Sequence, residues 1–196
     1  LGLPPMLTAA TGMDAITHCI EAVLATPANP PAEGIGLDGL WRGWRHIKRA
    51  VGNGSDRTAR WEMMMASTEG ALAFVKGLGA VHSMSHAAGR IKELRLHHGT
   101  LNAVILPTIL RFNEEACLDV YPRLRQAMGL AANADLAKAV EQLNADLGLP
   151  RGLSEMGLTE ELIEDMVPHA INDLATMTNP KKVSAEDFAD LYRQAM

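Results

Sequence analysis

The sequence predicts an all-α fold, on the basis of three observations. Apolar residues recur at the helical period in almost every long segment, and the alternating β-branched runs typical of strands are absent. The chain has 196 residues, 47% of them hydrophobic, which is enough to bury a core. Internal repeats and low-complexity tracts are not evident. We therefore expect residues 1–196 to form a single helical bundle domain.

Each predicted helix is delimited by a breaker or a cap. The first ends before the prolines at 27–31, and the second ends at Gly52-Asn53-Gly54. Ser55 or Asp56 would cap the third helix. The fifth contains Pro107, which should kink it. The predicted ranges, in chain order, are 11–25, 32–51, 56–75, 80–89, 101–116, 118–128, 134–147, 159–174 and 184–195.

The composition indicates a cytoplasmic protein that binds neither nucleic acid nor membranes. The formal net charge is −5 and the 18 basic residues are scattered, whereas both partners need clustered positive charge. No apolar run reaches the roughly 18 residues of a membrane span. Cys19 and Cys117 lie far apart, and we expect reduced thiols. Because the chain starts at Leu1 rather than Met, we interpret it as a fragment.

Histidines are concentrated where chemistry is expected. Four of the seven lie between residues 82 and 98, and Asp14 and His18 stand four residues apart. Residues four apart share a helix face, so each of the pairs Asp14–His18 and His82–His86 can point at one spot. A carboxylate and imidazoles that converge suit a divalent ion such as Fe²⁺ or Zn²⁺. Cysteine is absent from these clusters, which excludes a structural thiolate zinc site.

Each of these features, taken alone, has a plainer interpretation. An Asp-x-x-x-His pair is usually a surface or capping pair, a lone His82 would be a hydrogen-bonded core histidine, and His97-His98 would be a polar turn. A helical metal-binding or interaction module without catalysis is therefore an alternative. Two helical metal enzymes are excluded. Phosphohydrolases need a His-Asp dipeptide and di-iron bundles need Glu-x-x-His pairs, and neither occurs.

Three segments together resemble the iron-containing (group III) alcohol dehydrogenase family. The first family signature resembles PPMLTAATGMDAITHCIEAV, the second ARWEMMMASTEGALAFVKGLGAVHSMSHAAG, and the third HHGTLNAVILPTILRFN. Late in the chain, Asp173 with Asn179-Pro180 is similar to the family's closing pattern, although Lys181 stands where arginine is common. The resemblance covers most of residues 1–116 and, more weakly, the C-terminal third.

The resemblance implies the helical C-terminal half of such an enzyme, a dehydroquinate synthase-like bundle without the α/β half that binds the nucleotide. It implies Asp14, His18, His82 and His98 as the metal ligands. His97 is the alternative to His98, because the interval after His82 is longer than in the commoner family members. We favour His98, since the glycine that follows it lets the backbone pass close to the site.

The implied activity is that of an NAD(P)-dependent dehydrogenase that interconverts a primary alcohol and an aldehyde, with Fe²⁺ or Zn²⁺ as the Lewis acid. His86, one turn beyond His82, would act in catalysis as a proton relay or contact the cofactor; a packed helix histidine is the alternative. Glu21, Glu62 and Glu69 are candidates to accept a hydrogen bond from a ligand ring.

The implied partners are a small alcohol or aldehyde and a nucleotide bound mainly by the missing N-terminal domain, so we expect the isolated fragment to be inactive. The family often dimerises, which leaves a homodimer open. Glycerol dehydrogenase-like and maleylacetate reductase-like members of the same superfamily are the alternative enzymes. Substrate identity, NAD versus NADP and the resident metal stay open at this stage.

Overall fold

The computed structural model describes all 196 residues and contains helices but no strands, which confirms the predicted fold class. The α-helices are α1 (Pro5–Leu24), α2 (Pro30–Gly52), α3 (Arg57–Ala73), α4 (Ala80–Ala88), α5 (His98–Asn113), α6 (Tyr121–Met128), α7 (Leu136–Asp146), α8 (Ile163–Ile171) and α9 (Ala185–Ala195). Short 3₁₀ helices lie at Phe74–Lys76, Lys92–Leu94, Glu114–Ala116, Leu153–Met156, Glu160–Leu162 and Leu174–Thr178. No helix combines the length and apolar character that a membrane crossing needs.

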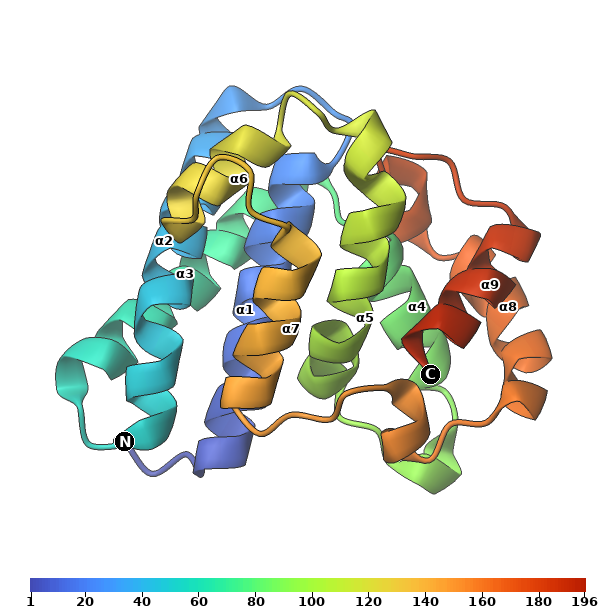
Figure 1. Cartoon of the computed structure of the whole chain (residues 1–196), viewed down its shortest axis with the longest axis horizontal. Coiled ribbons are helices and arrows are strands. Elements are labelled where there is room, and N and C mark those ends of the chain that lie inside the picture. Colours follow the sequence, from blue (N-terminus) through green and yellow to red (C-terminus); the bar gives the residue numbers. More distant parts are fainter.

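The helices form two groups that meet along α1 and α5. In Figure 1, α2 and α3 pack against α1 on one side of the molecule, and α4, α8 and α9 lie together on the other. Helix α5 contacts α1, α4, α7 and α9, so it joins the two groups. The proposed ligands come from α1, α4 and α5 and therefore lie where the groups meet.

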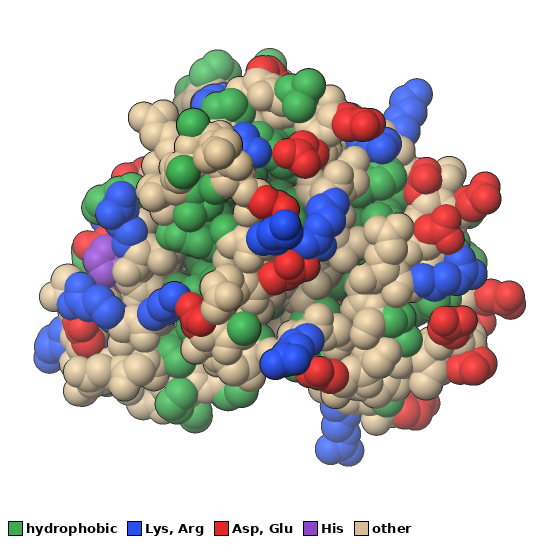
Figure 2. All heavy atoms as spheres, viewed as in Figure 1, with side chains coloured by type: hydrophobic (Ala, Val, Ile, Leu, Met, Phe, Trp, Pro, Cys, Tyr) green, Lys and Arg blue, Asp and Glu red, His purple; other side chains and the backbone are tan.

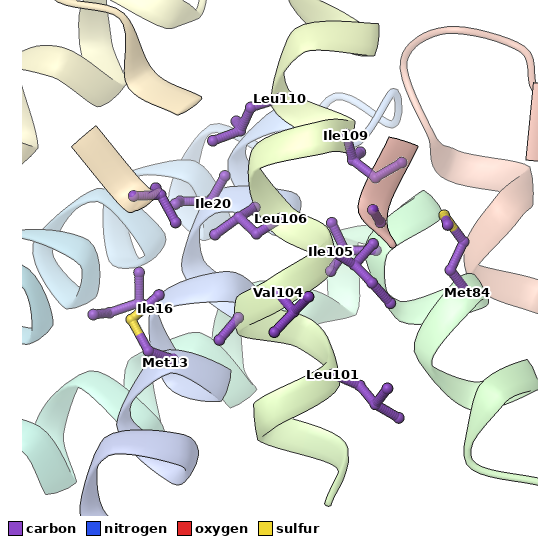
Figure 3. Close-up of a cluster of buried hydrophobic side chains, with 14 of the residues drawn as sticks. Met13, Ile16, Ile20, Met84, Leu101, Val104, Ile105, Leu106, Ile109 and Leu110 are labelled. Carbon is purple, nitrogen blue, oxygen red and sulfur yellow. The ribbon is translucent and has the colours of Figure 1, made fainter. Parts of the chain in front are cut away.

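A continuous hydrophobic core holds these helices in register. Met13, Ile16 and Ile20 of α1 and Leu106 of α5 belong to it, and Figure 3 shows both sets on neighbouring ribbons. The core comprises 43 buried residues and extends into α9, so the chain has one core rather than two. Each fully buried aliphatic side chain contributes about 1.5–3 kcal/mol. The packing of α1 on α5 thus fixes the spacing of side chains at the site.

Local capping explains several helix starts. Asp56, and not Ser55, caps α3, because its carboxylate accepts from the backbone N–H of Ala59 at 2.9 Å. Ser184 and Asp187 form a reciprocal capping box at the start of α9. These starts agree with the predicted ones to within two residues.

Other boundaries were predicted wrongly. Helix α1 begins at Pro5 rather than at residue 11, because proline suits the first helical turn, where an N–H has no partner. Helix α5 begins at His98 rather than at residue 101 and continues through Pro107. Pro107 leaves the carbonyl of Ala103 without its helical donor, and Asn144 of α7 supplies that donor at 2.6 Å.

The helix predicted at 159–174 is shorter in the structure. Helix α8 ends at Ile171, and Asp173 then caps the 3₁₀ helix Leu174–Thr178 by accepting from the backbone N–H of Ala175 at 2.9 Å. Asp173 also hydrogen-bonds to His86 of α4. The chain thus leaves the helical path next to a residue that contacts another helix.

Two further expectations can be compared with the structure. Cys19 and Cys117 are both buried and unpaired, and burial raises the pKa of their thiols to about 12 and about 11 respectively. Both thiols therefore stay protonated at neutral pH. On the face shown in Figure 2, basic and acidic side chains are interspersed, with acidic ones gathered over α8 and α9.

Candidate metal centre

The structure brings together the four side chains that the sequence indicates as ligands. Asp14 and His18 come from α1, His82 from α4 and His98 from the first residue of α5. Asp14 Oδ1 lies 3.9 Å from His18 Nε2, 3.8 Å from His82 Nε2 and 3.5 Å from His98 Nε2. The ligand atoms of Asp14, His18 and His82 all lie within 4.8 Å of one another.

The three separations from Asp14 Oδ1 suit a divalent ion. In a tetrahedral site with metal–ligand bonds of about 2.1 Å, neighbouring ligand atoms are about 3.4 Å apart. The three distances from Asp14 Oδ1, 3.5–3.9 Å, lie slightly above that value. The ligand atoms would need to move by roughly half an ångström or less along these edges. One carboxylate and three imidazoles are also a donor set that Fe²⁺ and Zn²⁺ accept.

The ligand atoms of the cluster have too few hydrogen-bond donors around them. Asn102 Nδ2 lies 2.7 Å from Asp14 Oδ1, 3.2 Å from His82 Nε2 and 3.1 Å from His98 Nε2. An amide nitrogen carries two N–H groups and cannot satisfy three acceptors. The Asn102 Oδ1 atom is buried without any partner. A cation bound among these atoms would interact with the lone pairs that receive no hydrogen bond from the Asn102 amide.

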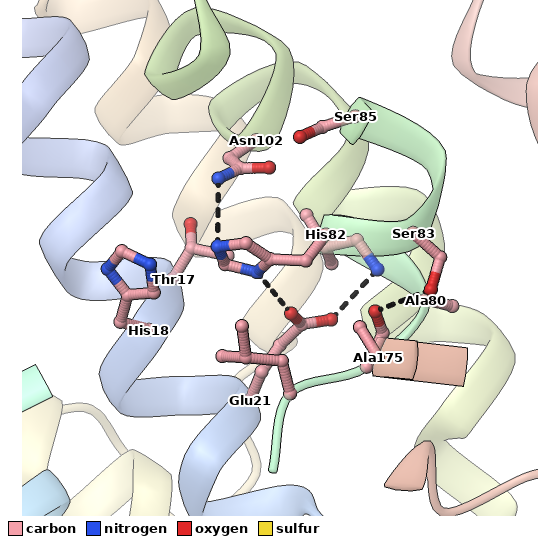
Figure 4. Close-up of polar contacts among 12 residues, drawn as sticks. Thr17, His18, Glu21, Ala80, His82, Ser83, Ser85, Asn102 and Ala175 are labelled. Carbon is pink, nitrogen blue, oxygen red and sulfur yellow. Dashed lines mark hydrogen bonds and ion pairs between the residues drawn. The ribbon is translucent and has the colours of Figure 1, made fainter. Parts of the chain in front are cut away.

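Glu21 fixes the position and the tautomer of His82. Its side chain is 3% exposed, and Oε2 lies 2.6 Å from His82 Nδ1 while Oε1 accepts from the backbone N–H of Val81 at 2.8 Å (Figure 4). The carboxylate also lies at the N-terminus of α4, where the helix dipole favours negative charge. His82 therefore donates from Nδ1 and keeps Nε2 free for a ligand bond.

The other two candidate glutamates have a different role. Glu62 Oε2 and Glu69 Oε1 lie 2.7 and 3.2 Å from the guanidinium of Arg42 on α2. Glu21 is thus the one of the three that contacts the cluster. The sequence did not distinguish them, because only the packing of α4 on α1 buries Glu21.

The remaining rings are held by contacts that the sequence did not reveal. His98 Nδ1 lies 2.9 Å from Ser85 Oγ, so α4 orients a ring that α5 carries. The His18 ring stacks on the His82 ring with centroids 4.6 Å apart, and it also packs against Phe74 at 5.2 Å. Ser85 is three residues after His82 and four before Gly89, an interval that carries no metal-site signature.

Of the two adjacent histidines, only His98 faces the cluster. His97 is exposed, and its Nδ1 lies 3.5 Å from Thr100 Oγ1. The following residue, Gly99, lies so close to α1 that a Cβ there would come 2.2 Å from the carbonyl oxygen of Ala10. The absence of a side chain at Gly99 therefore lets the start of α5 approach the helix that carries Asp14.

The electrostatic setting favours neutral rings. Burial lowers the pKa of His98 to about 4, and it also lowers the pKa of His18, while the Asp14 carboxylate opposes both shifts. Both rings are therefore unprotonated at pH 7. Metal binding requires this form, so a cation need not displace protons from these two residues at neutral pH.

His86 lies beside the cluster and is oriented by Asp173. Its Nδ1 is 2.9 Å from Asp173 Oδ2, and its ring stacks on that of His98 with centroids 5.2 Å apart. The side chain is 46% exposed, which leaves Nε2 accessible. Asn179, from the same late motif as Asp173, accepts from the backbone N–H of Ala80 at 3.0 Å and caps α4. The late motif thus supports the helix that carries His82 and His86.

Replacing Glu21 with glutamine is expected to lower the affinity for Fe²⁺ or Zn²⁺ by about 10- to 100-fold, because the His82 ring loses its charged acceptor. Competition with a coloured chelator measures the affinity. Glu62→Gln is the matched control, since this glutamate pairs with Arg42 and does not contact the cluster. Equal affinities for both variants and the parent protein would contradict the role assigned to Glu21.

Comparison with known proteins shows the family of the chain. Residues 8–196 match the family model described as "Fe-containing alcohol dehydrogenase family, C-terminal". The chain is 54% identical to 4-hydroxybutyrate dehydrogenase from Cupriavidus necator and 35% identical to 1,3-propanediol dehydrogenase from Citrobacter freundii. Both matches cover 100% of this chain and 53% and 52% of the relatives respectively. The chain thus spans about half the length of the curated relatives that it matches.

Solved structures give the same result. A crystal structure of 1,3-propanediol oxidoreductase superposes with a TM-score of 0.94 at 34% identity, over 100% of this chain and 53% of that one. An alcohol dehydrogenase from Oenococcus oeni superposes with a TM-score of 0.92 at 30% identity, over 99% and 52%. The chain therefore belongs to the Fe-containing alcohol dehydrogenase family, and residues 8–196 correspond to its C-terminal part.

Proposed function

We propose that this chain forms the metal-binding part of the active site of an NAD(P)-dependent alcohol dehydrogenase. Asp14, His18, His82 and His98 would hold one Fe²⁺ or Zn²⁺ ion. The observation that carries the proposal is the approach of three Nε2 atoms, from three helices, to within 3.5–3.9 Å of one carboxylate oxygen. The names of the relatives, all dehydrogenases or oxidoreductases of small alcohols, support it.

The bound ion would supply Lewis-acid chemistry that makes the alcohol hydroxyl more acidic. Asp14 contributes the only negative charge of the four donors, so a loaded site keeps a charge of about +1, which favours an anionic oxygen over water. His86 would take up the hydroxyl proton at Nε2, the ring atom that Asp173 leaves free. Asp173, at 2.9 Å from Nδ1, would then stabilise the protonated ring.

The nucleotide would be bound mainly by residues outside this chain. Dinucleotide phosphates are usually held at a Gly-rich turn between a strand and a helix, and this chain has no strand. His86 would be its main contact from this side, because it is exposed next to the cluster. We expect the isolated chain to bind metal but to show little turnover.

The proposed substrates are primary alcohols that carry a second polar group. Two of the relatives are named for 4-hydroxybutyrate and 1,3-propanediol, which are a hydroxy acid and a diol. Both present a primary hydroxyl at one end of a short chain. We propose that this chain acts on the same class.

The experiment has two arms. The purified chain is analysed for bound iron and zinc, and one equivalent is expected. The chain joined to a nucleotide-binding half is then assayed with 4-hydroxybutyrate or 1,3-propanediol and NAD⁺ or NADP⁺, before and after chelation. Turnover that is lost on chelation and restored by Fe²⁺ or Zn²⁺ supports the proposal. A chain that binds neither ion would leave only a helical module without catalysis.

A further inference from the structure

A polar pocket adjoins the proposed metal centre at His86. It has a volume of about 310 Å³ and lies between α4 and α8, where Arg90, His169 and Asp173 are among its lining residues. A neighbouring hollow of about 280 Å³ shares Arg90 and His169 with it. The proposed reaction assigns no role to Arg90 or to His169.

The pocket contains a cation without a partner. The guanidinium of Arg90 makes no hydrogen bond or ion pair within the chain, and only its backbone N–H is bonded, to Ala87 at 3.2 Å. Both oxygens of Asp173 are already engaged, one by His86 and one by the backbone N–H of Ala175. Asp165 lines the neighbouring hollow but lies beyond ion-pair distance of Arg90. An anion in the pocket would therefore meet a free cation.

The pocket relates this cation to the metal centre. Helix α4 ends at Ala88, and Arg90 lies in the turn that follows it, four residues after His86. Arg90 and His86 line the same pocket, and the His86 ring stacks on the ring of the proposed ligand His98 with centroids 5.2 Å apart. A molecule in the pocket would therefore lie next to both His86 and Arg90.

A short hydroxy acid carries one group for each of the two sites. In 4-hydroxybutyrate four bonds of about 1.5 Å separate the hydroxyl oxygen from the carboxylate carbon, an extended span of about 5 Å. Arginine also binds carboxylates in a two-pronged geometry that neutral alcohols cannot offer.

We propose that Arg90, assisted by His169, forms a subsite for a substrate carboxylate, so that this enzyme prefers short hydroxy acids to neutral alcohols of the same length. The inference rests on the proposed function and adds the residue that sets its selectivity. The hydroxyl end would lie at the metal centre, and the carboxylate end would lie in the pocket between α4 and α8.

The test compares 4-hydroxybutyrate with 1,4-butanediol in the metal-loaded enzyme that includes the nucleotide-binding half. The two substrates share chain length and a primary hydroxyl, and they differ in the carboxylate. Arg90→Ala is expected to lower the ratio of their kcat/KM values by about 10- to 100-fold, mainly through KM for the acid. Arg90→Lys should keep part of the preference. Arg57→Ala, which removes an exposed arginine at the start of α3, should leave the ratio unchanged.

The outcomes separate this inference from the function on which it rests. If the parent enzyme oxidises both substrates and Arg90→Ala leaves the ratio within about twofold, the carboxylate subsite is wrong and the dehydrogenase proposal stands. A parent enzyme that prefers the diol overturns the subsite in the same way. If the parent enzyme binds metal and cofactor but oxidises neither substrate, the proposed function itself fails, and the subsite fails with it.

Discussion

Replacing His98 with alanine is expected to lower the affinity for Fe²⁺ or Zn²⁺ by more than about 100-fold, since even the loss of a hydrogen-bond partner behind a ligand costs 10- to 100-fold. The variant would lose one of four donors, and three protein donors bind a divalent ion more weakly. The His98 side chain is 40% exposed, so its removal should leave the fold intact. Chelator competition gives the affinity, and elemental analysis of the dialysed protein gives the stoichiometry.

His97→Ala provides an unusually close control. It removes the same side chain from the adjacent residue, but that ring points away from Asp14 toward Thr100. Its affinity should match that of the parent protein. Equal losses in the two variants would mean that general damage to the start of α5 explains the effect. A loss of affinity confined to His97→Ala would mean that His97, and not His98, is the ligand.

The fold class was predictable because it depends on patterns within single segments, whereas several helix ends depend on contacts between segments. Asp56 is a local cap, and the start of α3 could be placed from it. The start of α5 has no side-chain cap, and the approach of Gly99 to α1 fixes it instead. Just after the end of α8, Asp173 likewise contacts a helix far away in sequence.

Some residues of the candidate site were likewise predictable from local patterns, and others were revealed only by packing between helices. Four-residue spacing paired Asp14 with His18 within one helix, but spacing alone left each pair with a plainer explanation, and only the family resemblance joined them across helices. Asn102 could have been suspected, because it lies one turn after His98 and shares its face. Ser85 carried no such signal, because its contact with His98 arises only from the packing of α4 on α5.

Replacing Gly99 with alanine is expected to destabilise the protein by about 1–3 kcal/mol and to weaken metal binding at the same time. The new Cβ would lie 2.2 Å from the carbonyl oxygen and 2.8 Å from the carbonyl carbon of Ala10, and it would lie 3.2 Å from Asp14 Cβ. Two of these three atoms are backbone atoms of α1, which cannot rotate away. The start of α5 must therefore move outward and carry His98 away from Asp14. Urea unfolding and chelator competition measure the two effects.

Gly34→Ala is the control that separates the contact with α1 from the general effect of replacing a glycine in a helix. Gly34 lies in α2, and a Cβ there would meet no atom within 4 Å. Alanine in an open helical position stabilises a protein by about 0.5–1 kcal/mol, because glycine is the poorer helix former. The two substitutions are chemically identical and should change the free energy of unfolding in opposite directions. If Gly99→Ala also stabilised the protein, or kept full metal affinity, the α1–α5 approach would not be what positions His98.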